Sequence, residues 1–358
     1  MSTSTTAGAP ALELGITTFA ETYPDPSTGR LLSHGERLRQ VVAEVELAER
    51  VGLDVYGVGE HHRADFAASS PAVVLAAAAA RTSRIRLTSA VTVLSSDDPV
   101  RVYQDFATLD LLSQGRAEVI AGRGSFTESF PLFGYDLDDY DELFAEKLEL
   151  LLAIRAAEST GGRVTWSGRH RPALRGAEVH PRTEGHELPV WVGVGGNPQS
   201  VVRAGLLGLP MALAIIGGQP ARFAPLADLH RRAVAEAGHD PLPVAVHAHG
   251  FVGEDAGSAA DAYYPSYATA MSQLGRERGW GAMTRRSFDE MRAPEGSLVL
   301  GDPRAVADKV LAMRRDLGIT RFLLHVSVGT LPHEQVLRAI ELLGTQVRPL
   351  VERELAAD

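Results

Sequence analysis

The chain has 358 residues, of which 45% are hydrophobic, and it carries a formal net charge of −10 at pH 7. This acidic balance argues against binding to nucleic acid or to an anionic membrane surface. The absence of cysteine excludes disulfides, thiolate metal sites and thiol nucleophiles. The longest apolar stretch, residues 71–80, is too short to span a bilayer. Residues 1–10 lack the features of a signal peptide, so we expect a cytoplasmic protein with a flexible N-terminal tail.

Strand-like and helix-like segments alternate along the chain, a pattern typical of parallel β/α construction. Eight strands are predicted at residues 12–18, 54–58, 85–93, 117–121, 189–194, 210–216, 244–252 and 321–327. Eight helices are predicted at residues 35–51, 71–81, 99–112, 139–157, 199–207, 220–237, 303–317 and 333–355. This pattern predicts a single α/β domain, residues 1–358, folded as a (β/α)8 TIM barrel.

Two segments interrupt the alternation. Residues 161–188 are rich in Gly, Arg, His and Pro, and we predict a hairpin-bearing insertion after the fourth strand and its helix. Residues 258–296 follow the seventh strand and contain Gly275, Gly279, Gly281 and Gly296. Glycine-rich excursions of this kind after a barrel strand are typical of lids over an active site.

The tripeptide Glu60-His61-His62 follows the second predicted strand almost directly. A carboxylate and two imidazoles are therefore expected at the C-terminal end of a strand, where the catalytic residues of β/α barrels lie. Histidine suits proton transfer because its unperturbed pKa is near neutrality. Glu60 either orients the imidazoles or caps the loop, and the sequence favours neither role. Taken alone, two adjacent histidines in a loop would be interpreted as surface residues.

Two further strand ends carry glycines beside polar groups. Gly122-Arg123-Gly124 follows the fourth strand, where glycines allow a ligand to approach the backbone and a guanidinium binds an oxyanion. A tight turn with a solvated arginine explains this motif equally well. Residues 193–200 follow the fifth strand and lead into a helix, which is typical of a phosphate site. They fail the dinucleotide-binding fingerprint, because Pro198 stands where glycine or alanine is required.

Three more histidines lie on predicted strands. His247 and His249 alternate along the seventh strand and so face the same side, and His325 lies on the eighth. Together with the histidines after the second strand they are compatible with a metal centre. No aspartate stands where a barrel hydrolase needs its last ligand, so we interpret them as polar residues that line a pocket and predict no metal.

The order of several motifs resembles the bacterial-luciferase-like flavin monooxygenases. The matching segments, spread over residues 12–350, are Gly59-Glu60-His61-His62, Val91-Thr92-Val93-Leu94, Asp98-Pro99-Val100-Arg101, Leu109-Asp110-Leu111-Leu112-Ser113-Gln114-Gly115-Arg116, Gly122-Arg123-Gly124, Phe133-Gly134 and Gly208-Leu209-Pro210. They are specific to the family but not to a substrate. The resemblance implies a TIM barrel that uses reduced FMN and dioxygen, with the reduced flavin supplied by a separate flavin reductase.

The resemblance also assigns catalytic residues by position. His61 resembles the family's catalytic histidine beside the reactive face of the flavin, with Glu60 and His62 as its neighbours. Should His61 prove structural, His62 becomes the candidate for proton transfer. Ala90-Val91 matches the place of a non-prolyl cis peptide beneath the isoalloxazine ring.

The phosphate site is assigned in the same way. Arg123 resembles the arginine that holds the FMN phosphate, aided by Gly195, Gly196 and Ser200 at the next strand end. Luciferases proper have a second phosphate-binding arginine where this chain has Asp141, and a reactive cysteine where it has Gly122. Light emission is therefore not implied, and a long-chain aldehyde substrate is disfavoured.

We interpret the chain as a monooxygenase or oxidoreductase that uses reduced FMN and dioxygen on a small organic substrate. Three alternatives stay open: a deazaflavin-dependent oxidoreductase of the same superfamily, a metal-dependent barrel hydrolase, and a non-catalytic flavin-binding relative. The small residues 76–80 and the family's habit of dimerising predict a homodimer that pairs helices 71–81 and 99–112.

Overall fold

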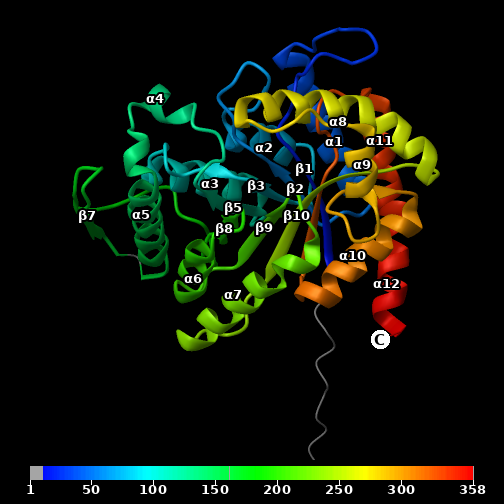
Figure 1. Ribbon diagram of the computed structural model, residues 1–358. Helices are drawn as coiled ribbons and strands as arrows, with labels where there is room; N and C mark the ends of the chain where they lie inside the picture. The colour runs from blue at the N-terminus through cyan, green and yellow to red at the C-terminus, as the bar shows by residue number, and fades with distance from the viewer. Residues whose placement is uncertain (1–10, 161, 358) are drawn as a thin grey trace, which may run out of the picture.

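The computed structural model describes residues 11–160 and 162–357, so the predicted flexible tail at residues 1–10 lies outside the described residues. Eight parallel strands form a closed barrel (Figure 1). In their order around the barrel they are β1 (Glu13–Thr18), β2 (Val55–Val58), β3 (Arg86–Ser89), β5 (Ala117–Gly122), β8 (Val190–Val194), β9 (Met211–Ile215), β10 (Val244–Val252) and β12 (Arg321–His325). The pairing of β12 with β1 closes the barrel, and the predicted TIM barrel is confirmed.

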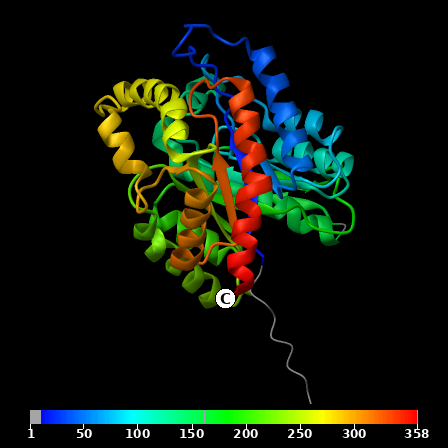
Figure 2. The ribbon, with the colours of Figure 1, turned by 90° about the vertical axis from the view of Figure 1, so that its right-hand side faces the viewer.

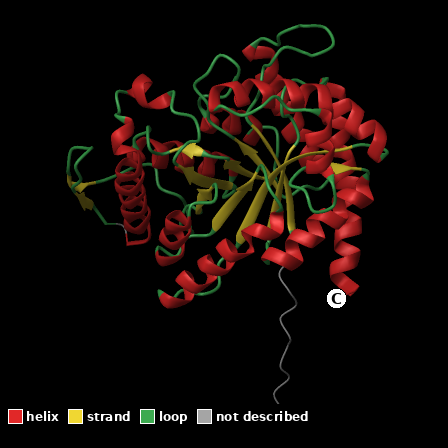
Figure 3. Ribbon diagram, in the orientation of Figure 1, coloured by secondary structure: helices red, strands yellow, loops and turns green. Residues whose placement is uncertain are grey.

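Helices surround the barrel on its outside (Figure 3). Those that follow the predicted pattern are α1 (His34–Arg50), α2 (Pro71–Ala79), α3 (Pro99–Ser113), α5 (Tyr140–Thr160), α6 (Pro198–Leu206), α7 (Ala224–Glu236), α10 (Pro303–Leu317) and α11 (His333–Leu342). Ser33 caps α1, since its side chain accepts a hydrogen bond from the Glu36 N–H. In the described part of the chain, no helix combines the length and the hydropathy needed to cross a membrane.

The helix predicted at residues 333–355 is interrupted. A π-helical turn, η3 (Leu343–Val347), joins α11 to α12 (Arg348–Ala357). The turn lies where the chain passes closest to Val51, and a Cβ added at Gly344 would lie 2.5 Å from the Val51 carbonyl oxygen. The helix predicted at residues 220–237 likewise begins with a 3₁₀ turn, η2 (Pro220–Phe223), ahead of α7.

The third strand is also interrupted. The predicted strand 85–93 forms β3 and a second short strand, β4 (Thr92–Val93), which pairs with β5. The peptide bond between Ala90 and Val91 is cis, as the family resemblance implied. The chain leaves the ladder here because the Val91 side chain turns into the barrel, where it packs against Gly122 and Gly193.

The segment 258–296, predicted as an insertion after the seventh strand, is helical over most of its length. It forms most of α8 (Ala256–Arg278) and all of α9 (Arg285–Arg292). Asp255 caps α8, and Tyr263 and Tyr267 bury one face of it, while Gly279 ends it with a φ of +71°. The glycines therefore act at the end of a helix and in turns. α8 lies across the end of the barrel at which the strands finish (Figures 1 and 2).

Several short elements complete the fold. The insertion after the fourth strand contains the predicted hairpin, formed by β6 (Val164–Trp166) and β7 (Leu174–Ala177). Two elements that the sequence did not indicate, α4 (Ser129–Phe133) and η1 (Leu137–Asp139), lie between β5 and α5. A further strand, β11 (Val299–Gly301), pairs with β10 outside the barrel.

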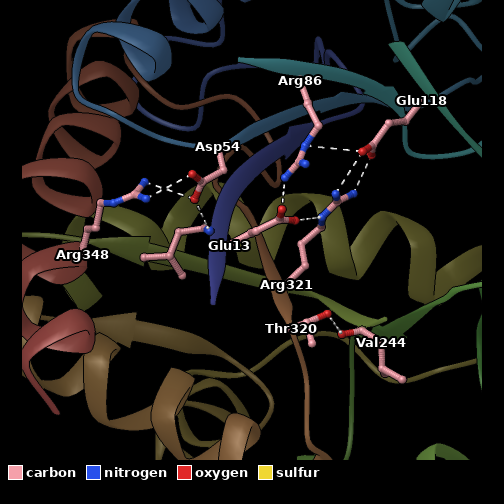
Figure 4. A network of polar contacts seen from close by, with 9 residues as sticks. Glu13, Asp54, Arg86, Glu118, Val244, Thr320, Arg321 and Arg348 are labelled. Atoms are coloured by element: carbon pink, nitrogen blue, oxygen red, sulfur yellow. Dashed lines mark hydrogen bonds and ion pairs between the residues drawn. The ribbon is translucent and has the colours of Figure 1, made fainter. Parts of the chain in front are cut away.

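The N-terminal end of the barrel is closed by buried charges (Figure 4). Arg321 of β12 is 2% exposed and donates hydrogen bonds to Glu118 of β5 at 2.6 and 3.1 Å and to Glu13 of β1 at 2.7 Å. Arg86 of β3 pairs with both carboxylates. The guanidinium of Arg321 also lies 4.3 Å from the Trp191 ring. Four of the eight strands are thus joined by one ionic network at this end.

Both lysines of the chain are buried. Nζ of Lys147 in α5 donates to the Ser95 carbonyl oxygen at 2.7 Å and lies 3.7 Å from the centre of the Tyr135 ring. Nζ of Lys309 in α10 donates to the Leu298 carbonyl oxygen at 2.6 Å. Burial lowers the pKa of each amine to about 8. Each lysine therefore fastens an outer helix to a loop beneath it.

The Arg321→Met variant should lose about 3–5 kcal/mol of unfolding free energy, because it leaves buried Glu118 without its main partner. Urea denaturation measures this loss. Arg304→Met is the control, since Arg304 makes only solvent-exposed ion pairs with Asp308 and Glu354, and its midpoint should barely move. Equal midpoints for the two variants would show that the network does not hold the barrel.

Candidate functional site

The tripeptide Glu60-His61-His62 lies two residues beyond β2, at the C-terminal end of the barrel. The His61 backbone N–H donates to the Ala68 carbonyl oxygen at 3.0 Å, which folds the loop back on itself. Glu60 and His61 are 6% and 8% exposed. The loop therefore holds these side chains in a packed setting and does not leave them on the surface.

Three phenylalanines surround the His61 ring. The ring centroids of Phe66, Phe19 and Phe126 lie 4.3, 4.9 and 4.9 Å from it, and the last two meet it edge-on. Nδ1 of His61 faces Glu128, whose Oε1 is 3.6 Å away. Because aromatic rings occupy three sides, the polar atoms of His61 have few routes to water. This fixes the orientation of the imidazole.

Glu128 is a site residue that the sequence did not reveal. It precedes α4, and the same Oε1 accepts a hydrogen bond from the His62 backbone N–H at 3.4 Å. Burial alone would raise the pKa of Glu128, but hydrogen bonds from His61 and from backbone N–H groups outweigh it and lower the pKa. The carboxylate is thus kept ionised beside His61. Its 66-residue separation from His62 explains why no local motif marks it.

Glu60 has two partners, so both roles considered for it are present. Oε1 lies 2.8 Å from Nε2 of His62, and Oε2 accepts the Val93 backbone N–H at 2.9 Å. The carboxylate therefore orients the second histidine and fastens the loop to β4. The hydrogen bond with Glu60 raises the pKa of His62. Each histidine thus has its own carboxylate, Glu128 for His61 and Glu60 for His62.

The Ala90–Val91 unit fills the middle of the barrel. Four glycines on the neighbouring strands, or directly after them, face this unit: Gly57, Gly59, Gly122 and Gly193. A Cβ added to any of them would lie less than 3.0 Å from an atom of Ala90 or Val91. At Gly122 the added Cβ would lie 2.4 Å from Val91 Cγ2. The barrel wall directly around Ala90–Val91, the unit predicted to lie beneath the flavin ring, therefore consists of glycine backbone. We call this unit the predicted flavin platform.

Beyond the Ala90–Val91 unit, toward the C-terminal ends of the strands, the barrel is open. Inward-facing residues near the strand ends are partly exposed, whereas those below them are buried; the partly exposed ones are Phe19, Ala90, Val91, Gly193, Ala214 and His247. A Cβ at Gly195, Gly196, Gly217 or Gly218 would meet no atom within 4 Å. We call this open region at the C-terminal end of the barrel the mouth. His61 lies beside it, because its ring is 4.9 Å from that of the partly exposed Phe19.

Arg123 lies at the edge of the mouth. Ala121 pairs with Val192 across β5 and β8, so Arg123 stands at the height of Val194, next to Gly195. Its Nη1 donates to Asp141 at 2.5 Å, and its guanidinium lies 5.2 Å from the centre of the Tyr140 ring. Asp141, at the position of the family's second arginine, is thus a direct partner of Arg123. This contact uses one of the five N–H groups of the Arg123 guanidinium.

The glycine turn leads into α6 as expected. Asn197 caps the helix by accepting the Gln199 N–H at 2.8 Å, and Gly195 is exposed. Ser200 is only 4% exposed, so the structure does not present it at the open corner with the glycines. The helix terminus, Gly195 and Gly196 therefore remain the accessible part of the predicted phosphate site.

The inward histidines do not form a metal cluster with the histidines after β2. Among the described residues, one group has three ligand atoms all within 4.8 Å of one another: Asp139, Glu142 and His170, of η1, α5 and the insertion. His247, His249 and His325 have ring centroids 5.2–6.2 Å apart and are not part of such a group. Burial lowers the pKa of His247 and His249, so both are neutral at pH 7.

A large cavity opens at the opposite end of the barrel. Its volume is about 1020 Å³, and its walls include Glu13, Arg86, Glu118, Trp191 and Arg321. None of the site residues named from the sequence lines it. In β/α barrels, residues at the N-terminal end contribute to stability, and catalytic residues lie at the C-terminal end. We therefore place the functional site at the mouth.

Residues 12–321 match the family described as luciferase-like monooxygenase. Among curated proteins, the chain is 36% identical to uncharacterized protein y4wF of Sinorhizobium fredii over 137 residues, which is 37% of this chain and 39% of that protein. It is 33% identical to 4-hydroxyprotoasukamycin monooxygenase of Streptomyces nodosus subsp. asukaensis over 170 residues, which is 46% of this chain and 45% of that enzyme. The chain thus aligns with less than half the length of each of these two relatives.

Solved structures share the fold. Monooxygenase RslO1 from Streptomyces bottropensis has a TM-score of 0.81 at 23% identity, covering 95% of this chain and 99% of that one. The oxygenating constituent of 3,6-diketocamphane monooxygenase of Pseudomonas putida, in complex with FMN, has a TM-score of 0.75 at 17% identity over 95% and 98%. An F420-dependent secondary alcohol dehydrogenase has 0.73 at 18% over 95% and 99%. The fold therefore does not separate the two cofactors.

Proposed function

Because the chain belongs to the luciferase-like monooxygenase family, we propose that it uses reduced FMN and dioxygen to oxygenate a small organic substrate. A separate flavin reductase would supply the reduced flavin. The observation that carries the proposal is His61, enclosed by three phenylalanines and faced by Glu128 at the rim of the mouth. This setting suits a proton-transferring group that must work out of contact with bulk water.

The residues at the mouth fit a flavin mononucleotide. The Ala90–Val91 unit would lie under the ring system, and a Cβ at Gly195, Gly196, Gly217 or Gly218 would meet no atom within 4 Å, so space is open at these strand ends. Arg123 and the start of α6 at Gly195 and Gly196 would hold the phosphate, through a guanidinium and backbone N–H groups. When bound, reduced FMN supplies the electrons that activate dioxygen.

The chain's own residues would govern protons and water around that chemistry. Glu128 lies 3.6 Å from Nδ1 of His61 and would orient the ring, which leaves Nε2 as the nitrogen for proton transfer. α8 covers the mouth and is fastened to its rim by Arg63, which donates to Glu277 at 2.6 and 2.7 Å. The organic substrate would reach His61 beneath this cover.

A deazaflavin-dependent oxidoreductase is the second candidate. It is supported by the similarity in fold to the F420-dependent alcohol dehydrogenase. The two candidates differ in one readily measured property, because a deazaflavin enzyme transfers hydride without consuming oxygen.

Oxygen uptake with reduced FMN decides between them. Across a panel of small organic substrates, the protein should couple uptake to product formation, and reduced F420 should give none. His61→Ala should lower this turnover by on the order of 10²–10⁴-fold, the usual contribution of a general acid or base. His239→Ala, at an exposed residue in the loop after α7 that lines the cavity at the opposite end of the barrel, is the control. Activity with F420 and not with FMN would refute the proposal.

FMN affinity tests the phosphate site. Arg123→Ala should weaken FMN binding by about 1.5–3 kcal/mol, the scale of a hydrogen bond to a charged group, and should leave riboflavin binding unchanged. Isothermal titration of both ligands gives the comparison. Asp141→Asn is the matched variant, because it removes the competing carboxylate and should not weaken FMN. If both flavins lose affinity equally in Arg123→Ala, the arginine does not bind phosphate.

We also propose the homodimer through α2 and α3. Val73 of α2 is 70% exposed and Leu112 of α3 is 64% exposed, large values for apolar side chains. The double variant Val73→Asp, Leu112→Asp should halve the mass measured by light scattering at micromolar concentration. A monomeric wild-type protein would rule this interface out.

A further inference from the structure

His325, the last residue of β12, has no part in the chemistry described so far. It is fully buried, with Nε2 2.7 Å from Glu21 Oε1 and Nδ1 3.2 Å from Thr17 Oγ1. Glu21 is 4% exposed, and its other oxygen accepts a hydrogen bond from Ser327 at 3.2 Å. These contacts form a chain of hydroxyl, imidazole and carboxylate inside the barrel.

The partners assign the tautomer of this imidazole. An ionised carboxylate can only accept a hydrogen bond, so Nε2 of His325 carries a hydrogen and donates it to Glu21. Nδ1 is then an acceptor for the Thr17 hydroxyl. A proton that reaches Nδ1 produces an imidazolium, which the adjacent carboxylate stabilises. The pair is therefore arranged to take up one proton.

A small cavity lies on the outer side of Glu21. Its volume is about 10 Å³, room for about one water molecule, and Glu21, Ser327 and His333 are among its walls. Nδ1 of His333 is buried and makes no hydrogen bond; Glu44 Oε1 lies 3.5 Å away. A water molecule here would give Nδ1 of His333 a hydrogen-bond partner in addition to its 3.5 Å contact with Glu44, and would connect His333 with Glu21. The remainder of the His333 side chain reaches solvent, being 24% exposed.

Arg37 lines the same cavity but does not relay protons, because a guanidinium stays charged in proteins. It pairs with Glu44 at 2.5 Å and donates to Thr18 and Ser327. Its fixed positive charge offsets the buried carboxylates. A proton route from Glu21 to solvent therefore runs through the cavity and His333.

The other end of the chain lies beneath the mouth. A Cβ at Gly57 would lie 3.0 Å from Thr17 Cγ2 and 2.9 Å from Ala90 Cβ, so Thr17 is next to the floor of the mouth. The His325 ring is 5.2 Å from that of His247, which is partly exposed to the mouth. The buried pair thus has Thr17 and His247, which lie beneath the mouth, on one side and the small cavity on the other.

We propose that Glu21 and His325 form a second acid–base site, which exchanges protons between the mouth and solvent through the cavity at His333. One proton enters at Nδ1 by way of the Thr17 hydroxyl, and one leaves Nε2 to Glu21 and then to the cavity water. Glu21 returns to its ionised form, no electrons move, and the imidazole is left with its hydrogen on Nδ1. A proton that passes in the opposite direction, from the cavity through Glu21 to Nε2 while Nδ1 gives its hydrogen to Thr17, restores the starting tautomer. The proposal rests on the proposed function in one respect: flavin oxidation and substrate oxygenation require protons to move at the mouth.

Exchange of the imidazole hydrogen with water tests the route without any flavin. In protein labelled with ¹⁵N-histidine, NMR follows the Nε2 hydrogen of His325, assigned by its loss in His325→Gln. Closing the outer end with His333→Phe should slow this exchange about tenfold or more. His34→Phe is the control, because His34 is likewise the first residue of a helix, is exposed, and contacts only the Ala64 carbonyl oxygen.

His333→Leu, which removes the ring without adding bulk, decides the matter if His333→Phe does not fold. Equal exchange rates in wild type and in the folded His333 variant would overturn the route. In the oxygen-uptake assay, Glu21→Gln should lower turnover, and His333→Phe should show a larger solvent isotope effect than wild type; an unchanged isotope effect would overturn the link to turnover. If wild type consumes no oxygen with reduced FMN, the proposed function fails, while the exchange experiment still decides the proton route.

Discussion

One side chain, Val91, determines how the interior of this barrel is divided. It enters the barrel at the break between β3 and β4, and it can do so only because Gly122 and Gly193 have no side chains there. Below it the barrel is filled by apolar residues and closed by the network around Arg321. Above it the inward positions are small residues, glycine or histidine, with Phe19 as the large apolar side chain among them, and the interior is partly exposed. The open mouth is thus a direct result of where the chain leaves the β3 ladder.

The residues around the mouth are chemically asymmetric. On the side of β5 and β8 the surface is glycine with a single arginine, which suits a flat, phosphate-bearing molecule. On the side of β1, β2 and β12 imidazoles are paired with carboxylates: His61 with Glu128, His62 with Glu60, and His325 with Glu21. No two of these histidines have the same carboxylate partner. The structure can therefore set the protonation of each one separately.

Local signals in the sequence were sufficient for the barrel itself. Apolar runs bounded by glycine and proline gave all eight barrel strands, and the position of Glu60-His61-His62 after β2 gave the end at which the site lies. The break in the third strand was visible only through the family resemblance, since residues 85–93 form one continuous strand-like segment with no glycine or proline to mark an interruption. The length and helical character of α8 were missed because its glycines were weighed more heavily than its capping Asp255 and its buried Tyr263 and Tyr267.

The contacts that sequence could not supply are those between loops distant along the chain. Glu128 reaches His61 from the loop after β5, and Glu21 reaches His325 across 304 residues. A lone glutamate in a loop has no periodicity or spacing that marks it, and its role follows only from what the closed barrel brings beside it. Ser200 illustrates the converse, because a hydroxyl that the glycine motif placed at a phosphate site is turned into the protein by the helix that carries it.

The two buried lysines have a practical consequence for the handling of this protein. Amine-reactive dyes, crosslinkers and activated resins modify exposed lysines. Both lysines of this chain are buried, and their amines donate hydrogen bonds to carbonyl oxygens beneath α5 and α10. In the folded state such reagents find no accessible lysine side chain. Modification of Lys147 or Lys309 would therefore report that the corresponding helix has opened, and the extent of labelling at these two lysines becomes a measure of local unfolding.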